Sequence, residues 1–492
     1  MGSFFTNNFA GGMNEIVSPA LLESNVATLL VNADINSGKI SSIKMPVKIA
    51  DTPDDLKYYG RINRSLVKFY ERFYWSINDA TEAPFYGGNI ENYLGIPYPD
   101  YTENVKIEAV SSGVLTGDYK YCVTFVNPNG WESAPGSLES YEKSITLDKQ
   151  NAKITVSWSD QRVSYAKIYR TQKQGADFYC VGEVKTSSGS FTDTVDDYIL
   201  VGLEPLQSTD NYPPPDGGKY LCASGNVFFL AIGSTLHFSS PGNPHAWPPL
   251  NFIGFDDVIT GITPEFQGVL VFTRNNTYRI TGADDIATLT KSYIPGNQGC
   301  TNYNTIAQVS NAPVWLSNDG ICLWDGERIS IVSQKVIKAT KLQPVCAVSA
   351  NDCYYLFMVK GTIVFDYRNA GTFSKLDFSC DFAWYDADVD ALYLQNNEGV
   401  FIYGEGDAGE YTYVSPFIGL PESAHTFFKE LILCIEGNAS VTLSNENKEI
   451  FTVDIKRSGQ HRLKLPYSTL CRYVQFKVCG KGTLKEAGVV YQ

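Results

Sequence analysis

Three aspartates close together in the chain, Asp386, Asp388 and Asp390, have a spacing that could bind a cation. Alternate carboxylates in a tight turn can surround a hard ion such as Ca²⁺. Two residues count against a calcium loop, because Ala391 stands where such a loop needs a turning glycine and Asn397 occupies its twelfth position. The alternative is an exposed turn between two strands, and the sequence favours that interpretation.

Two short motifs resemble known sites without completing them. The GEGDAG segment from Gly404 matches the spacing of a dinucleotide-binding loop, but Glu405 would face a phosphate and no helix follows. The SNDGICLW segment is close to the Asp-box turn of sialidase-type propellers, with Asp319 and Trp324 in place and the glycine one position early. Such boxes are structural turns even in enzymes, so this motif indicates a propeller more than a glycosidase.

The remaining residue types suggest no catalytic constellation. The four histidines lie in separate segments, and His245 beside Trp247 is best explained by packing. The eleven cysteines include no CxxC pair and fall largely in apolar runs, where a thiol behaves as a small hydrophobe. A glycosidase would need two facing carboxylates, which sequence alone cannot pair. We therefore expect no enzyme, no cofactor and no metal site.

The elements that position these residues repeat along the chain. Five hairpins of apolar strand, polar turn and apolar strand have their turns at Gly233, Asn275, Asp319, Lys360 and Asn397. Their spacing is close to the roughly 40–45 residues of one four-stranded propeller blade. A composition rich in Tyr, Phe, Gly and Asn also favours strands and turns over helices. The sequence thus predicts an all-β chain built around a β-propeller of about six blades.

Changes in the strand and turn pattern along the chain predict further domains around the propeller. Short strands with turn signals between them are typical of a fibronectin III-like or immunoglobulin-like sandwich, in which we expect Trp158 to be the core aromatic against Tyr119, Tyr121 and Tyr169. The predicted parts are an extended N-terminal arm at 1–50, a first propeller blade or closing strands at 51–103, the inserted sandwich at 104–204, propeller blades at 205–420, and a C-terminal β-sandwich or platform at 421–492.

The chain is acidic, with 53 Asp and Glu against 39 Lys and Arg and a formal net charge of −14. Such a surface repels nucleic acid and anionic membranes, which argues against a sequence-reading DNA-binding protein. No apolar run reaches the roughly 18 residues of a membrane span, and the opening residues lack the pattern of a secretory signal. We expect a protein without a membrane-spanning segment that is synthesised and folded in a cytoplasm.

Several segments resemble one protein family. The opening Gly-Gly, the SPALL segment and VNADINSGKISSIKMP are similar to the N-terminal arm of the tail nozzle proteins, or tail tubular protein B, of short-tailed bacteriophages. The segments GDYKYCVTFVNPNGWESAPGS and FSSPGNPHAWPP and the C-terminal strand set are also similar to parts of such nozzles. The resemblance departs at Lys44-Met45-Pro46, where Arg-Pro is more usual.

The resemblance implies a structural protein of the virion tail, made in the cytoplasm of the host bacterium. It implies a homo-hexameric ring below the tail adaptor that docks neighbouring tail proteins or fibres and encloses the channel through which double-stranded DNA passes at ejection. An acidic wall would repel DNA, which carries about one negative charge per 1.7 Å. The candidate channel-lining residues are Asp256, Asp257, Asp284, Asp285, Asp386, Asp388 and Asp390, with ordinary solvated turns as the alternative for each. The alternative function is a glycan-binding or glycan-degrading tail propeller.

Overall fold

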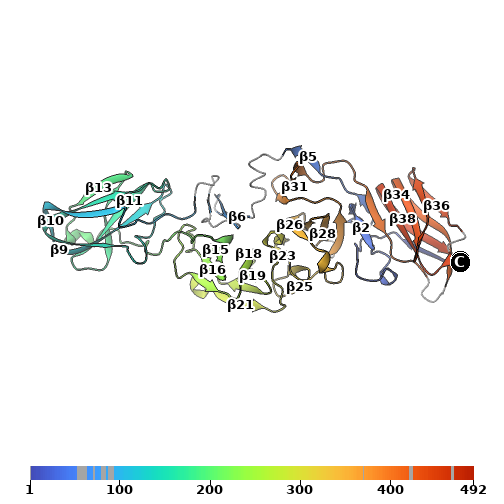
Figure 1. Ribbon diagram of the computed structural model, residues 1–492, viewed down its shortest axis with the longest axis horizontal. Helices are drawn as coiled ribbons and strands as arrows, with labels where there is room; N and C mark the ends of the chain where they lie inside the picture. Colours follow the sequence, from blue (N-terminus) through green and yellow to red (C-terminus); the bar gives the residue numbers. More distant parts are fainter. Residues whose placement is uncertain are drawn as a thin grey trace. The chain divides into compact units, whose positions relative to one another are not determined.

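The computed structural model describes residues 2–51, 64–69, 72–78, 85–86, 93–368, 371–419, 425–466 and 470–492. Strands dominate these residues, and the helical elements are single turns such as α2 (Asp197–Leu200) (Figure 1). The prediction of an all-β fold is confirmed. Within the described ranges, no helix is long and apolar enough to cross a membrane.

The five predicted hairpins all form, and each lies within a run of four strands in blade order. Four of these runs are separate four-stranded sheets, and the fourth along the chain is one end of a 14-stranded sheet. The first sheet contains β14 (Lys219–Ser224), β15 (Val227–Ile232), β16 (Thr235–Phe238) and β17 (Phe252–Gly254). The second contains β18 (Ile259–Glu265), β19 (Gly268–Thr273), β20 (Thr277–Thr281) and β21 (Thr290–Ile294). The third contains β22 (Ala307–Val309), β23 (Ala312–Leu316), β24 (Ile321–Trp324) and β25 (Ile329–Ile331).

The last two blades recruit the N-terminal arm. The fourth blade contains β26 (Pro344–Ala350), β27 (Cys353–Met358), β28 (Thr362–Asp366) and β29 (Thr372–Leu376). The fifth contains β30 (Phe382–Asp386), β31 (Ala391–Asn396), β32 (Gly399–Ile402) and, as its outer strand, β5 (Val47–Ala50). The rest of the arm supplies β1 (Gly2–Thr6), β2 (Leu29–Val31), β3 (Ala33–Asp34) and β4 (Ile40–Ser42). The expected extended arm is therefore a series of short strands added to sheets formed by later residues.

The chain divides into two compact units, and blades pack in the same way within each. Unit 1 comprises Met1–Ile62, Phe272–Tyr278 and Tyr293–Gln492, and unit 2 comprises Asn63–Val271 and Arg279–Ser292. In unit 1, β22 lies against β26 and β26 against β30; in unit 2, β14 lies against β18. Because these are first strands of successive blades, the packing is that of a β-propeller, and the prediction of an all-β propeller is confirmed.

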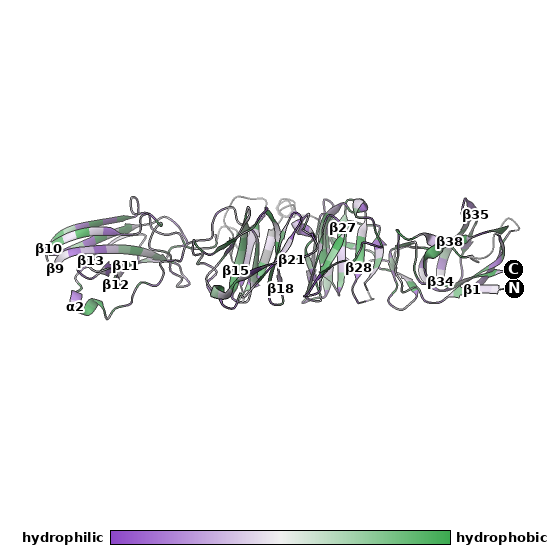
Figure 2. Cartoon of the chain, turned by 90° about the horizontal axis from the view of Figure 1, so that it is seen from below, coloured by the Kyte–Doolittle hydropathy of each residue, from purple (hydrophilic) through white to green (hydrophobic). Residues whose placement is uncertain are grey.

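The middle strands of the blades are rich in hydrophobic residues because they are buried. All six residues of β19 and all four of β24 are buried, as expected for strands covered on both faces. Figure 2 shows hydrophobic residues in green along blade strands such as β15 and β27. Gly233 makes the first hairpin turn with a positive φ of 57°, a conformation that glycine adopts at no steric cost. All eleven cysteines are free thiols.

The strand pair predicted within 51–103 forms as β6 (Arg64–Phe69) and β7 (Arg72–Ile77), joined by the short β8 (Phe85–Tyr86). β6 and β7 contact β14 of the first blade. The rest of the predicted first blade, at 52–63, 70–71, 79–84 and 87–92, lies outside the described residues.

The segment predicted as an inserted sandwich forms one five-stranded antiparallel sheet with its own core. Its strands are β9 (Val105–Val126), β10 (Lys143–Ser157), β11 (Tyr165–Thr171), β12 (Phe178–Val184) and β13 (Ser188–Asp193), in the order β12-β11-β9-β10-β13. The three predicted tyrosines are buried in its core, but Trp158 is only partly buried at the margin. Its indole N–H donates to the Val163 carbonyl at 3.2 Å, which keeps the ring at the margin of the core and corrects its expected central place.

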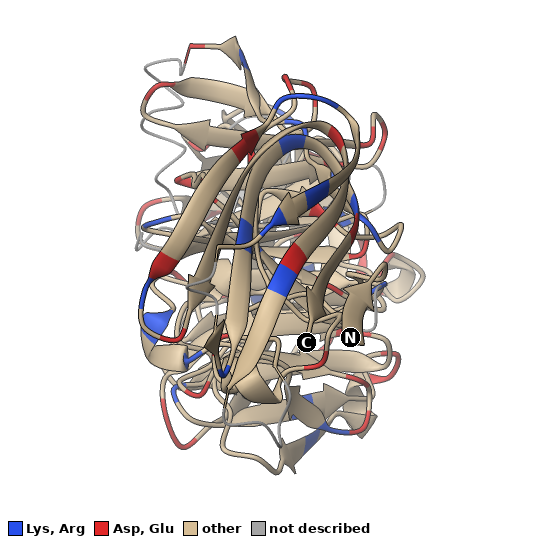
Figure 3. Cartoon of the chain, turned by 90° about the vertical axis from the view of Figure 1, so that its right-hand side faces the viewer, with Lys and Arg blue, Asp and Glu red and all other residues tan. Residues whose placement is uncertain are grey.

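Two long strands organise the C-terminal residues. β34 (Thr426–Asn445) pairs with β38 (Val474–Tyr491) from one end to the other, flanked by β33 (Tyr411–Val414), β35 (Glu449–Ile455) and β36 (Gly459–Lys464). β37 (Leu470–Cys471) pairs with the start of β34, and β1 pairs with the end of β38, so the two termini are neighbours (Figure 3). The backbones of the two strands approach closely where Gly437 faces Gly482, since a Cβ on Gly482 would lie 2.0 Å from the Glu436 carbonyl oxygen.

Candidate functional site

The predicted acidic residues of unit 2 lie in two blade loops. Asp256 is exposed and Asp257 half-buried between β17 and β18, and the Asp257 carboxylate accepts the Val258 N–H at 2.7 Å. Asp284 and Asp285 are exposed after β20, where the Asp285 carboxylate accepts the Ala287 N–H at 3.1 Å and caps a single 3₁₀ turn. Both loops are thus built partly by their own aspartates.

The aspartate triplet of unit 1 forms the turn between β30 and β31. The Asp386 carboxylate accepts the Asp388 N–H at 3.0 Å, and the Tyr385 hydroxyl donates to Asp390 at 2.6 Å. Asp390 has a positive φ of 51°, which aspartate tolerates better than most side chains. In the described part of the chain no three His, Cys, Asp or Glu side chains converge as metal ligands. The triplet therefore has the geometry of the exposed turn.

Among the described residues, no lysine or arginine forms an ion pair with Asp257, Asp284, Asp285, Asp386, Asp388 or Asp390. The structure brings each predicted group together within its own loop, two loops in unit 2 and one in unit 1. Whether they line a channel stays a prediction.

The two motifs set aside at the sequence level have structural roles. Ser317 donates to the Gln298 side chain at 2.6 Å, and Gln298 donates to Asp319 at 2.8 Å, so the Asp-box-like turn is fixed by hydrogen bonds. The GEGDAG segment is a loop that ends at β33, and its Gly406 N–H donates to the Met45 carbonyl at 2.9 Å. No helix begins there, so it lacks the helix N-terminus of a dinucleotide site.

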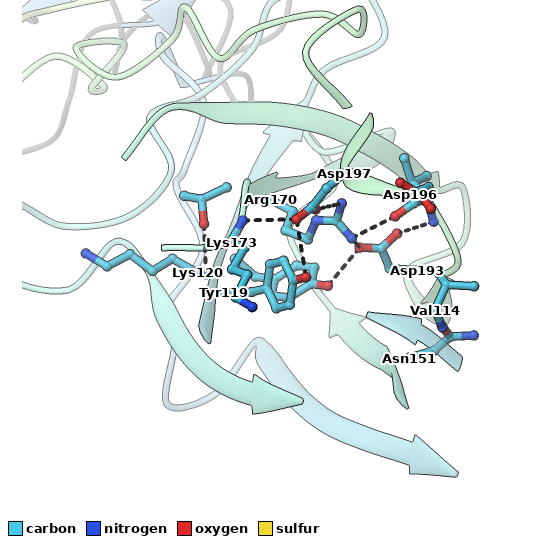
Figure 4. A network of polar contacts seen from close by, with 12 residues as sticks. Val114, Tyr119, Lys120, Asn151, Arg170, Lys173, Asp193, Asp196 and Asp197 are labelled. Carbon is cyan, nitrogen blue, oxygen red and sulfur yellow. Dashed lines mark hydrogen bonds and ion pairs between the residues drawn. The ribbon is translucent and has the colours of Figure 1, made fainter. Parts of the chain in front are cut away.

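A buried ion-pair network holds the β9–β13 sheet together (Figure 4). Arg170 on β11 donates to Asp193 and to Asp197, each at 2.9 Å, and the Tyr121 hydroxyl donates to Asp193 at 2.7 Å. The side chains of Arg170 and Asp193 are fully buried. Because buried charges are tolerated only when paired and hydrogen-bonded, this network ties β13 and α2 to the sheet.

A polar pocket of about 360 Å³ in unit 1 was not predicted from the sequence. Its floor is one face of the fourth blade, where strand pairing places Asp366 beside Cys353 and Thr372, and Val364 beside Tyr355 and Ser374. The opposite face of the same strands packs into the main core. No sequence signal marks this floor, because strand alternation shows only that one face is less apolar.

The β3–β4 hairpin and the residue after β32 form the walls of this pocket. The hairpin contributes Asp34, Ser42 and Lys44, and Tyr403 closes another side, its ring 6.0 Å from that of Tyr355 at an angle of 69°. The Asp34 carboxylate also accepts the Asn36 N–H at 3.0 Å, which fixes its position. A contact between the arm and a blade therefore creates the pocket.

Two charged groups of the pocket are paired with each other, and its thiol and phenol groups are neutral. Arg368 donates to Asp366 through Nε and Nη2, both at 3.3 Å, and Nη2 lies 3.2 Å from the Cys353 sulfur. Burial, with the Asp366 carboxylate nearby, raises the pKa of Cys353 to about 12, so its thiol is neutral and a poor nucleophile at pH 7. Burial likewise raises the pKa of the Tyr355 and Tyr403 hydroxyls, which remain hydrogen-bond donors.

Comparison with known proteins assigns no family. No protein-family model matches the chain, and no curated protein sequence is found to be similar. The WD40 domain of Neurospora crassa Pan2 is similar at 7% identity and a TM-score of 0.29 over 64% of this chain and 99% of that one. BamB of Moraxella catarrhalis is similar at 9% identity and a TM-score of 0.28, over 73% of this chain and 99% of that one. An exo-β-1,3-galactanase of Phanerochaete chrysosporium is similar at 11% identity and a TM-score of 0.21, over 92% of this chain and 100% of that one. TM-scores this low support no functional argument, and the fold assignment rests on the sheet topology of the chain itself.

Proposed function

We propose that this chain is a structural subunit of the tail nozzle of a short-tailed bacteriophage, in which copies form a ring around the DNA ejection channel. The observation that supports it most is a pair of exposed blade turns in which Asp284, Asp285, Asp388 and Asp390 form no ion pair with a lysine or arginine among the described residues. Blade turns project from the ends of a propeller, where a passing molecule would meet them.

Charge explains why such turns suit a channel. Duplex DNA is densely negative, so a basic wall would bind it and slow its passage, whereas an acidic wall keeps it free to move. Screening limits this repulsion to roughly 8 Å at physiological salt, so only residues at the wall act. The partners in this proposal are six copies of the chain, the tail adaptor and other ring proteins, tail fibres or other tail proteins, and DNA that passes without sequence preference. The location is the virion tail.

Charge reversal tests the channel. We expect the purified full chain to form rings in negative-stain images, and the triple variant Asp386→Lys, Asp388→Lys, Asp390→Lys to retain duplex DNA that the wild type releases. That retention should fall steeply with salt, because it depends on phosphate contacts. The matched Asn variant keeps the turn's hydrogen-bond acceptors and separates charge from folding.

A second control replaces three acids with lysine at positions outside the blade turns. Glu103, Glu139 and Asp177 are exposed acids in the segment of the β9–β13 sheet and are not part of any blade turn. If replacing these three with lysine retains DNA as well as the blade-turn variant does, position is irrelevant and the channel assignment is wrong. Light scattering that shows only monomers at every concentration would count equally against the ring.

The alternative, a glycan-binding or glycan-degrading tail propeller, has one observation in its favour, the polar pocket beside the fourth blade. Hydrolysis of a polysaccharide that is lost on replacing one pocket carboxylate would favour this alternative over a purely structural role.

A further inference from the structure

The pocket on the fourth blade has the size of a small-molecule site. Its volume of about 360 Å³ lies at the lower end of the roughly 300–1,000 Å³ range of such sites. A ligand there would rest on the β27–β29 face, between the β3–β4 hairpin and Tyr403. The space admits a single sugar or a disaccharide end and excludes a folded polypeptide.

The charged groups of the pocket favour neither an anionic nor a cationic ligand. Two carboxylates, Asp34 and Asp366, are balanced by Lys44 and Arg368. Arg368 is already engaged by Asp366, so its charge is not available in full to an anionic ligand. A cation would lack the ligand set it needs, because no metal-binding group of three acids, histidines or cysteines occurs in the described ranges. A neutral ligand meets no such conflict.

The polar groups of the pocket suit a polyol. Ser374 and Thr372 contribute hydroxyls that donate and accept, Asp34 contributes an acceptor, and Lys44 a donor. Each hydroxyl of a sugar also donates and accepts, so such a ligand can satisfy both kinds of group at once. The ring of Tyr403 beside Tyr355 adds an apolar surface for the C–H face of a pyranose.

We propose that this pocket binds a neutral sugar, as a monosaccharide or as the end of a neutral oligosaccharide. The proposal rests on the alternative function, glycan binding, and is independent of ring assembly. Hydrolysis is not part of it, because Arg368 holds Asp366 as an acceptor and leaves no paired general acid beside Asp34.

Two pocket variants test the assignment. Asp34→Asn keeps the oxygen that accepts the Asn36 N–H but weakens the acceptor offered to a ligand, and Ser374→Leu fills the floor. The probes are the monosaccharides and disaccharides of glucose, galactose, mannose and N-acetylglucosamine, measured by saturation-transfer NMR and calorimetry on the full chain. We expect at least one to bind saturably at millimolar concentration, roughly tenfold weaker in Asp34→Asn, and not in Ser374→Leu.

Controls separate the outcomes. Asp388→Asn, on the exposed β30–β31 turn, should bind the same sugar as the wild type does, and thermal unfolding of all variants should show that they fold. No binding of any probe would overturn both the pocket assignment and the glycan-binding alternative. Binding that survives both pocket variants would overturn the pocket assignment alone. Tighter binding of galacturonic acid than of galactose would overturn the neutral class.

Discussion

A single buried histidine makes unit 2 sensitive to acid. His245 is 2% exposed, and its Nδ1 accepts the Gly95 N–H at 3.2 Å. Burial, aided by the charges of Arg72 and Arg162, lowers its pKa to about 4. In the unfolded chain the pKa of a histidine is about 6.5. The neutral ring therefore makes its full contribution to the free energy of unfolding above that pH, and this contribution is lost as the pH falls toward 4. Its full size is about 3 kcal/mol.

We expect His245→Asn to flatten this profile, because asparagine can still accept the Gly95 N–H but does not titrate. The measurement is the denaturant midpoint of the full chain between pH 7 and pH 4.5, taken as the difference between wild type and variant. His425→Asn changes an exposed histidine of unit 1 and should follow the wild-type profile. Parallel profiles for wild type and His245→Asn would contradict the prediction.

For single residues, the sequence predicts roles that depend on neighbours in the chain. The packing role of His245 and the structural turn at Asp319 followed from neighbours in the chain, and both are seen. The Arg170–Asp193 pair and the meeting of Asp34 with Asp366 join distant segments, and no spacing rule connects them. Sites of that kind need the strand register, which the sequence leaves open.

At the level of elements, predictability follows the hydrophobic pattern. The central hairpins can be predicted because their inner strands, such as β19 and β24, are largely apolar and wholly buried and lie next to polar turns. The outer strands are weaker signals, since β25 is half-buried throughout and β5 is exposed throughout. That β5 would complete the fifth blade could not be predicted, because a four-residue strand fits the free edge of many sheets.

The docking of β5 depends on a glycine in the strand beside it. A Cβ on Gly399 would lie 2.4 Å from the Ala50 carbonyl oxygen, so Gly399→Ala must push β5 away from β32. We expect a loss of about 1–3 kcal/mol in the free energy of unfolding, as for other overpacked sites. Thermal unfolding measures the loss, and limited proteolysis should cut the arm near Val47–Ala50 sooner than in the wild type.

A second blade glycine provides the matched control. Gly254, in β17, has no atom within 4 Å of where its Cβ would lie. Gly254→Ala should therefore change the free energy of unfolding by no more than roughly 0.5 kcal/mol. Equal effects of the two substitutions would show that backbone freedom, and not the contact with β5, sets the cost.

For the whole molecule, the net charge of −14 opposes association of identical copies. If copies assemble into the proposed ring, that repulsion must be overcome by packing, and salt should help by screening it. The Debye length falls from about 30 Å at 0.01 M salt to about 8 Å at 0.15 M. We expect light scattering to show a larger assembled fraction at the higher salt. The Asn triple variant at Asp386, Asp388 and Asp390, which removes three negative charges, should need less salt.

The same experiment can reveal a different kind of interface. Residues 381–410 contain eight acids and no Lys or Arg, whereas β36 contains the bases Arg462 and Lys464. If an acidic segment of one copy met a basic strand of the next, salt would weaken assembly, and the Asn triple variant would weaken it further. Binding of a neutral sugar should change little over the same salt range, which provides an internal control. Assembly that falls as salt rises would thus contradict the repulsion model and indicate contacts between opposite charges.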